Sequence, residues 1–291
     1  MIVSGSLRLG ARTFAPGELA VMAIINRTPD SFFDKGATFD PEAALAAVAR
    51  AVDEGADIID IGGVKAGPGD KVDAAEEIRR TVPTIAAVRD AYPQVVISID
   101  TWRAEVAAEA VAAGADLLND TWGGPDPALA EVAAATGAGL VCSHAGGLDP
   151  RTRPHRVGYA DVVADVLATV THLVERATAL GVRPDGVLID PAHDFGKNTR
   201  HSLAITRRLD ELVATGWPVL VAVSNKDFVG ETLDLPVGDR LAGTLAATAV
   251  SAWLGARVFR AHQVAETRRV LDMVATIKGT RDPSVARRGL A

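Results

Sequence analysis

Apolar positions along the chain follow two alternating patterns. Short apolar runs rich in branched residues recur through the whole sequence, which is typical of strands buried in a parallel sheet. Longer Ala-rich segments between them carry apolar residues at helical spacing. Eight strands are predicted, at residues 19–25, 56–61, 95–99, 115–119, 138–142, 186–189, 218–223 and 256–259.

Local signals mark the ends of the helices that lie between these strands. Asp40 is a good N-cap residue, and Pro41 follows it at the first helical position. Gly55 is placed to end that helix in the left-handed conformation. A Gly-Ala pair stands before four of the predicted strands, so we expect the same helix-to-strand turn at each of them.

Eight strand–helix units without a linker predict a single (β/α)8 TIM barrel. We expect one domain over residues 1–291, with the barrel at about 19–280 and a short C-terminal tail. Residues 1–18 are expected to form a β-hairpin that closes the bottom of the barrel. The alternative is an open doubly wound sheet, but no predicted strand leads into GxGxxG or GxxxxGKS.

Composition narrows the class of partner. The net charge of −7 argues against nucleic acid and against an anionic membrane. Cys142 is the one cysteine, which we interpret as a buried small hydrophobic residue, and the chain suits a reducing, cytoplasmic location. The apolar segment 241–256 is too short to span a membrane and is expected to be a buried helix.

Polar residues stand at the carboxyl ends of all eight predicted strands. In a barrel of this kind these ends meet on one face, where ligands bind. Eight convergent polar ends are better explained by a ligand than by helix caps, because unpaired polar groups cost about 1–3 kcal/mol each. The ends are Asn26, Asp60, Asp100, Asn119, Ser143-His144, Asp190, Ser224-Asn225-Lys226 and Arg260-Ala261-His262.

These residue types suggest the chemistry of the ligand. Asp100, Asn119 and Asp190 offer acceptors and one amide, which suit a flat heterocycle bearing an amino group and ring N–H donors. Arg260 and His262 are cationic donors for an anion, ideally a phosphate. Asn26 suits either the same anion or Mg²⁺, which prefers oxygen ligands.

Several motifs together resemble the dihydropteroate synthase family over about residues 20–277. They are "MAIINRTPDSFFDKG", "SIDTW", "LLNDT", "LIDPAHDFGKN", "SNKDFVGETL" and "FRAHQV". Members of that family are TIM barrels and homodimers. They condense 6-hydroxymethyl-7,8-dihydropterin pyrophosphate with p-aminobenzoate, using Mg²⁺ and releasing pyrophosphate.

The resemblance implies a role for each matching residue. The pterin ring would be held by Asp100, Asn119, Asp190 and Lys226. The pyrophosphate would meet Asn26, Arg260 and His262, with Mg²⁺ near Asn26. Lys226, Arg260 and His262 would be the catalytic residues.

The loop after the second strand departs from the family pattern. Working synthases usually read Gly-Gly-Glu-Ser-Thr-Arg-Pro-Gly here, whereas this chain reads "GGVKAGPG". Ala66 replaces the threonine and Gly67 replaces the arginine. Losing both contacts is expected to cost about 3–6 kcal/mol. Lys65 either restores part of this as a point charge or is a solvated loop lysine.

Two further motifs depart from the family on the same half of the site. The family's Ser-Arg-Lys-Ser is "SNKD" here, which places Asn225 at the arginine and Asp227 at the second serine. In "DPAHDFGK", His193 replaces the first Phe and Asp194 replaces a glycine. We expect Asp227 to repel the carboxylate of p-aminobenzoate and His193 to narrow its pocket.

The pterin half is therefore expected to be retained and the second-substrate half to be altered. This pattern is similar to the second, inactive synthase-like paralogues. The sequence predicts a pterin or pterin pyrophosphate binder with absent or very weak dihydropteroate synthesis. The alternatives are a synthase of low activity and a transferase that uses the pterin site with another second substrate.

Overall fold

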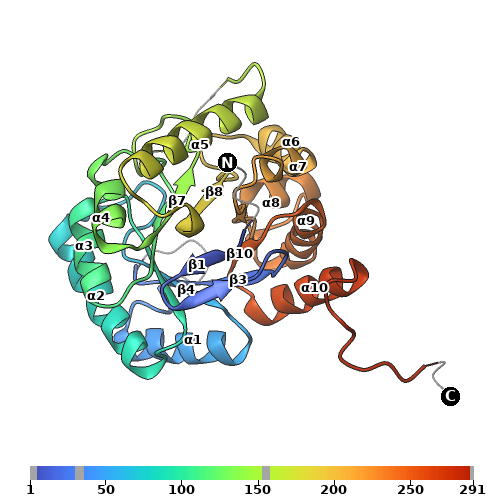
Figure 1. Cartoon of the computed structure of the whole chain (residues 1–291), viewed down its shortest axis with the longest axis horizontal. Coiled ribbons are helices and arrows are strands. Elements are labelled where there is room, and N and C mark those ends of the chain that lie inside the picture. Colours follow the sequence, from blue (N-terminus) through green and yellow to red (C-terminus); the bar gives the residue numbers. More distant parts are fainter. Residues whose placement is uncertain (1–4, 30–35, 153–157, 289–291) are drawn as a thin grey trace.

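Eight parallel strands form the centre of the computed structural model (Figure 1). They are hydrogen-bonded in the order β8-β7-β6-β5-β4-β3-β10-β9. The structure describes residues 5–29, 36–152 and 158–288. The last gap in the barrel, between β8 and β9, is bridged by a parallel contact between Ile189 and Val219. The strands are β3 (Ala20–Asn26), β4 (Ile58–Gly62), β5 (Val96–Asp100), β6 (Leu117–Asp120), β7 (Gly139–Ser143), β8 (Val187–Asp190), β9 (Leu220–Val221) and β10 (Val258–Ala261).

The predicted TIM barrel is confirmed, with strand boundaries shifted by one or two residues. The exception is β9, which keeps two of the six predicted residues. Helices ring the barrel in Figure 1, and two short 3₁₀ helices lie at Pro184–Gly186 and Val237–Asp239. The α-helices are α1 (Pro41–Asp53), α2 (Ala74–Ala91), α3 (Ala104–Ala112), α4 (Ala128–Thr136), α5 (Val162–Ala179), α6 (Thr199–Arg207), α7 (Leu209–Val213), α8 (Asp227–Leu233), α9 (Leu241–Leu254) and α10 (Val264–Ile277).

The expected helix ends are present. The Asp40 side chain accepts hydrogen bonds from two backbone N–H groups in the first turn of α1. Four glycines before strands have positive φ, with values of 94° at Gly55, 114° at Gly114, 76° at Gly137 and 111° at Gly255. A residue with a Cβ is disfavoured in this region of φ, which explains why glycine recurs at the turn.

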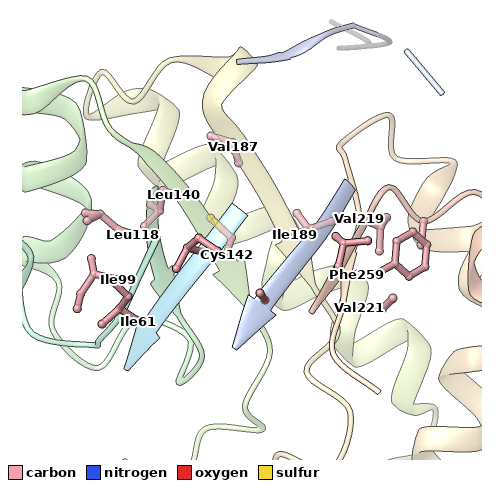
Figure 2. Close-up of a cluster of buried hydrophobic side chains, with 14 of the residues drawn as sticks. Ile61, Ile99, Leu118, Leu140, Cys142, Val187, Ile189, Val219, Val221 and Phe259 are labelled. Carbon is pink, nitrogen blue, oxygen red and sulfur yellow. The ribbon is translucent and has the colours of Figure 1, made fainter. Parts of the chain in front are cut away.

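Strand side chains alternate between two apolar layers. Outward residues such as Ile61, Ile99 and Phe259 pack beneath the helices, as Figure 2 shows. Cys142 belongs to this layer and is buried, as expected of a small hydrophobic residue. Inward residues, among them Met22, form a second cluster inside the barrel.

The N-terminal hairpin closes one end of that inner cluster. Strands β1 (Leu7–Leu9) and β2 (Arg12–Phe14) pair antiparallel. Leu7, Leu9 and Phe14 are buried among the inward strand residues. The predicted closure of the bottom is therefore confirmed for the described residues, and the polar strand ends lie at the opposite end, which we call the mouth.

Helix α9 is less buried than expected. Its inner face carries Thr244, Thr248 and Ser251, all buried. Val250 is 48% exposed and Trp253 is 56% exposed on the outer face. The expectation of a buried helix is wrong because the polar side of the segment, not the apolar one, faces the barrel. Among the described helices, none is both long and apolar enough to span a membrane.

Candidate functional site

The polar residues of the mouth are the inward positions that follow the apolar interior. Side chains alternate along a strand, so Asp60 comes two residues after the buried Ile58, and Arg260 two after Val258. The structure brings these ends together at one face. We call the floor of the mouth the set Asp60, Asp100, Asn119, Asp190, Lys226 and Arg260, and the rim the loops at residues 63–72 and 144–152.

Asp60 is the centre of the floor. Its carboxylate is fully buried and accepts a hydrogen bond of 2.6 Å from Ser98 Oγ. Arg260 Nε donates to it at 2.6 Å, and Asn119 Nδ2 contacts both of its oxygens at 3.3 Å. A buried carboxylate needs this many partners to offset its desolvation. Asp60 therefore fixes the orientation of its neighbours.

Asp100 shares the same arginine. Its Oδ2 accepts from Arg260 Nη2 at 2.7 Å, and its Oδ1 accepts from Thr121 Oγ1 at 3.0 Å. Burial raises the pKa of Asp100 to about 7, the attraction of Arg260 opposes this, and the charge of Asp60 adds to it. The carboxyl group can therefore change its protonation state near neutral pH.

Asn119 and Asp190 present further acceptors. Because the amide nitrogen of Asn119 donates to Asp60, its Oδ1 is left to accept from a ligand. Asp190 is almost fully buried, and one of its oxygens accepts from the backbone N–H of Ala192 at 2.7 Å. Burial also raises the pKa of Asp190. Together with Asp100, these side chains form a set rich in acceptors.

Lys226 lies beside this set, with its ammonium over an aromatic ring. Its Nζ is 4.7 Å from the centre of the Phe195 ring and donates to the carbonyl of His193. Burial lowers the pKa of Lys226, and the carboxylates of Asp194 and Asp190 oppose that change. Phe195 also meets Trp122 edge-to-face at 5.1 Å, so an aromatic wall borders the mouth.

Two connected compartments fill the mouth. The inner one encloses about 540 Å³ of empty space and is lined by the floor residues Asn119, Asp190, Lys226 and Arg260. The outer one, of about 560 Å³, includes Asn26, Trp102 and Trp122 in its lining. Both are lined by Ile24, Ala66, Thr121, Arg260 and His262.

The three residues expected to meet an anion lie on this shared border or in the outer compartment. Asn26 and His262 line the outer compartment, and His262 Nδ1 is 3.0 Å from Ser224 Oγ. Arg260 is already held by two carboxylates. Its charge is therefore largely compensated before any ligand arrives.

The two altered positions of the loop between β4 and α2 lie at the rim. Ala66 lines both compartments and contributes only a methyl group. A Cβ at Gly67 would meet only Lys65 Cε, at 3.8 Å. The loop therefore has room at these positions but no hydroxyl or guanidinium group on them.

Asn225 and Asp227 point away from the compartments. Asn225 is buried and donates from Nδ2 to Gln263 Oε1 at 3.1 Å. The Asp227 side chain is 80% exposed and forms an ion pair with Arg240 at 2.9 Å. The negative charge expected near the second substrate is therefore at the surface and partly compensated.

His193 is not in the mouth. Its ring is fully buried, stacks on Phe228 at 5.6 Å and has Nε2 3.0 Å from Thr206 Oγ1. These partners belong to α6 and α8, so the ring packs between helices outside the barrel. The expectation that His193 narrows a ligand pocket is wrong, because Phe195 two residues later lines the inner compartment instead.

The fit of the site to Mg²⁺ is poor. Within the described residues no group of three or more His, Cys, Asp or Glu side chains could hold a metal ion. Asn26 is the expected ligand and lines the outer compartment, but the Asp100 carboxylate in the same lining is bound by Arg260 and Thr121. The described side chains thus offer Mg²⁺ little beyond one amide oxygen.

Some site residues were missed by the sequence reasoning. Asp60 has none of the roles that the resemblance implies, although its inward position after Ile58 signals one. Phe195 lies inside the quoted motif "DPAHDFGK". Trp102 and Trp122 each follow a floor strand by two residues, and this spacing was the available signal.

Comparison with known proteins agrees with this geometry. Residues 22–262 match the family described as "Pterin binding enzyme". The chain is 62% identical to "Inactive dihydropteroate synthase 2" of Mycobacterium leprae, over 97% of this chain and 99% of that protein.

Solved structures give the same result. A Yersinia pestis dihydropteroate synthase in a sulfonamide drug complex has a TM-score of 0.89 and 34% identity, covering 94% of this chain and 99% of that one. A Coxiella burnetii dihydropteroate synthase in complex with pteroic acid has a TM-score of 0.85 and 31% identity, covering 96% and 100%. The chain therefore belongs to the pterin-binding enzyme family and is a homologue of dihydropteroate synthase.

Proposed function

We propose that this protein binds a pterin ring in the inner compartment and makes dihydropteroate very slowly or not at all. The observation that carries the proposal is a contrast within one mouth. The floor residues Asn119, Asp190, Lys226 and Arg260 line the inner compartment, and Asp100 lines the adjoining outer one. The rim has no hydroxyl at Ala66 and no guanidinium at Gly67.

The floor suits the donor pattern of a pterin. A pterin presents an exocyclic amino group and a ring N–H on one edge, and both need acceptors. Asp190, the Oδ1 of Asn119 and Asp100 provide acceptors in a partly dry site, where each hydrogen bond is stronger than in water. Lys226 is placed to donate to the carbonyl oxygen of the ring. Because these groups are held by Asp60 and Ala192, little ordering is needed on binding.

The weak activity follows from charge. A leaving pyrophosphate needs donors whose charge is not already compensated. Arg260 is shared between Asp60 and Asp100. The loss of two contacts to a charged group corresponds to about 3–6 kcal/mol, or about 10²–10⁴ in binding or rate. The name of the M. leprae relative, an inactive synthase, agrees with this proposal.

Calorimetry tests the proposal. We expect 6-hydroxymethylpterin to bind the wild-type protein, and we expect p-aminobenzoate to add no heat in the presence of pterin and pyrophosphate. Asp100→Asn should weaken binding of the pterin. Asp227→Asn is its matched control, because Asp227 lines neither compartment. Failure of the pterin to bind at millimolar concentration would refute the proposal.

A low-activity synthase is the second candidate. Lys226, Arg260 and His262, the catalytic residues implied by the resemblance, all line the inner compartment. If this candidate is right, pyrophosphate release should require both substrates. Release that depends on the pterin ester and on a different nucleophile would favour the third candidate, a transferase with another second substrate.

We also propose that the protein is a homodimer in the cytoplasm. Ala242, Ala246, Val250 and Trp253 form an exposed stripe on α9, and Met273 and Ile277 are exposed on the adjacent α10. Contiguous exposed apolar patches often mark an interface with another protein. Trp253→Lys should convert the dimer to a monomer in light scattering, whereas Val285→Lys on the tail should not. A wild-type monomer would contradict the proposal.

We propose that Mg²⁺ binds to this protein only together with the phosphates of a ligand. Mg²⁺ commonly binds through substrate phosphates with few protein ligands. Asn26 would be its one contact from this chain. No step of the proposed pterin binding needs the metal, so EDTA should leave the affinity for 6-hydroxymethylpterin unchanged.

A further inference from the structure

Charge is distributed unevenly between the floor and the rim of the mouth. The floor contains three carboxylates, Asp60, Asp100 and Asp190, against the two cations Arg260 and Lys226. An anionic group of a ligand is therefore not favoured at that depth. Any attraction for an oxyanion must come from nearer the surface, where the rim loops lie.

Arg151, on the rim loop after β7, reaches across to the other rim loop. Its Nε donates to the carbonyl oxygen of Gly67 at 3.4 Å, and its Nη1 donates to that of Asp70 at 2.5 Å. Gly67 is the position where the family carries an arginine. The guanidinium group of Arg151 therefore lies beside the position where the family has an arginine of its own.

The contacts of Arg151 leave donors available. A guanidinium has five N–H donors, and the two hydrogen bonds to the opposite loop use Nε and Nη1. Both acceptors are backbone carbonyls, so neither compensates the charge as a carboxylate would. In the described part of the chain Arg151 has no ion pair, although the carboxylates of Asp70 and Asp149 are exposed on the same two loops.

The Gly67 position also has space and a second cation beside it. A Cβ on Gly67 would meet only Lys65 Cε, at 3.8 Å. Lys65 in turn lines the outer compartment. Two basic side chains, one from each rim loop, therefore approach Gly67, and of the two Lys65 lines the outer compartment.

The backbone of Arg151 is held in an unusual conformation. Its φ of 65° lies in the left-handed region, which residues other than glycine rarely adopt. The two hydrogen bonds to the opposite loop support this conformation. The conformation directs the side chain across the rim.

We propose that Arg151 replaces the missing loop arginine as the residue that binds an oxyanion at the outer end of a bound pterin ligand. This rests on the proposed pterin binding and names the ligand class more closely: a pterin whose substituent ends in a phosphate or a carboxylate. Specificity for the anion is then supplied from the β7–α5 loop rather than from the β4–α2 loop.

Calorimetry with three probes tests this inference: neutral 6-hydroxymethylpterin, its pyrophosphate ester and pteroate. Arg151→Gln should weaken binding of at least one anionic probe about tenfold and change the neutral probe less than about twofold. The anionic probe that responds identifies a phosphate or a carboxylate as the group. Arg50→Gln, an exposed arginine on α1, is the matched control.

A double variant separates anion binding from simple loop support. Arg151→Gln with Gly67→Arg returns a guanidinium to the opposite loop and should restore affinity for the anionic probe. Equal loss of affinity for neutral and anionic probes, with a lower melting temperature, would show that Arg151 only supports the loops and would overturn the inference. Binding of the neutral probe with no effect of Arg151→Gln on either anionic probe would overturn it while leaving the proposed function intact. No binding of any probe to the wild type would overturn both.

Discussion

The floor and the rim of the mouth are built in different ways. The floor side chains project mainly from strand ends, and each is fixed by a buried partner, as Asn119 and Arg260 are fixed by Asp60. The rim consists of loops, and the Arg151 side chain of one loop contacts backbone carbonyls of the other, at Gly67 and Asp70. A substitution in the floor disturbs several buried groups at once, whereas the rim substitution Arg151→Gln removes only the hydrogen bonds of one partly exposed side chain to the opposite loop.

This difference explains how one half of a site can be altered without loss of the other. Ala66 and Gly67 replace larger residues of the family pattern, and the fold around them stays intact. Had Asp60 been changed instead, Arg260 would have been left buried with one partner fewer. If the floor and the rim are independent, a substitution in the rim should leave the affinity for the pterin ring unchanged.

The largest effect is expected from removing the centre of the floor. Asp60→Ala leaves the charge of Arg260 buried and half-paired, and breaking such a pair costs about 3–5 kcal/mol. Urea unfolding measures this. Asp227→Ala, which removes the exposed carboxylate that pairs with the largely buried Arg240, is the control and should cost less, because Arg240 keeps its hydrogen bond to the Asn225 carbonyl. Similar losses in the two variants would show that the floor has no special role in stability.

The next largest effect should come from rebuilding the rim. Ala66→Thr with Gly67→Arg returns a hydroxyl and a guanidinium group, and the free space at Gly67 accommodates the change. We expect pyrophosphate affinity to rise about 10–100-fold and affinity for 6-hydroxymethylpterin to stay constant. A change in affinity for the pterin would mean that the two halves are coupled.

Steady-state turnover with p-aminobenzoate measures how much synthase activity the Ala66→Thr, Gly67→Arg variant regains. The double variant should still fall short of a normal synthase, and adding Asp227→Ser should bring a further small gain. Because Asp227 is 80% exposed and paired with Arg240, that gain should be less than about tenfold. A larger gain in kcat/KM for p-aminobenzoate would show that the charge of Asp227 acts more strongly than its position suggests.

A smaller effect is expected from Asp100→Asn on pterin binding. The substitution replaces one acceptor oxygen with a donor, and a net hydrogen bond to a charged group contributes about 1.5–3 kcal/mol. Calorimetry should give affinity about tenfold weaker or more. The opposite change, Asn225→Asp, adds a carboxylate outside the compartments and serves as the control. If the two variants bind the pterin equally well, Asp100 does not contact the ring.

The last effect is the pH dependence of stability due to Asp100. Its pKa is raised to about 7 in the folded state from about 3.9 in the unfolded chain. Between these values the folded state holds a proton that the unfolded state lacks, so stability is greatest below pH 4 and falls as pH rises toward 7. The slope is at most about 1.4 kcal/mol per pH unit.

The Asp100→Asn variant isolates this contribution. The difference in unfolding free energy between the wild type and the variant should fall from pH 4 to 7 and level off above 7. Pterin affinity of the wild type should rise over the same range, because the ionised carboxylate is the better acceptor. A stability difference that is flat with pH would contradict the raised pKa.

The fold was predictable because it depends on short-range patterns. Alternating apolar runs fixed seven of the strands to within two residues, and glycines such as Gly55 and Gly255 take the predicted left-handed conformation. The short β9 was not predictable, since its boundaries depend on the bridge to β8. The exposure of Trp253 was missed because composition does not reveal which face of a helix meets the barrel.

The site was predictable where it follows the strands and not where it depends on loops. Asp100, Asn119 and Asp190 lie at the mouth because alternation places them there. His193 was misplaced because a loop residue next to the floor can turn either way, and here its ring enters the helix layer. Arg151 was missed because its partner, Gly67, is 84 residues away in the chain.

Steady-state turnover of the unmodified protein tests the central claim most directly. The assay measures pyrophosphate release from the pterin pyrophosphate ester with saturating p-aminobenzoate and Mg²⁺. We predict activity that is absent or at least about 10²-fold below a typical family member, because two contacts to the charged pyrophosphate are missing from the β4–α2 loop. A kcat/KM in the usual enzyme range of about 10⁴–10⁸ M⁻¹s⁻¹ would contradict the account. Lys65, Arg151 and their neighbours would then have fully replaced the groups missing from the rim.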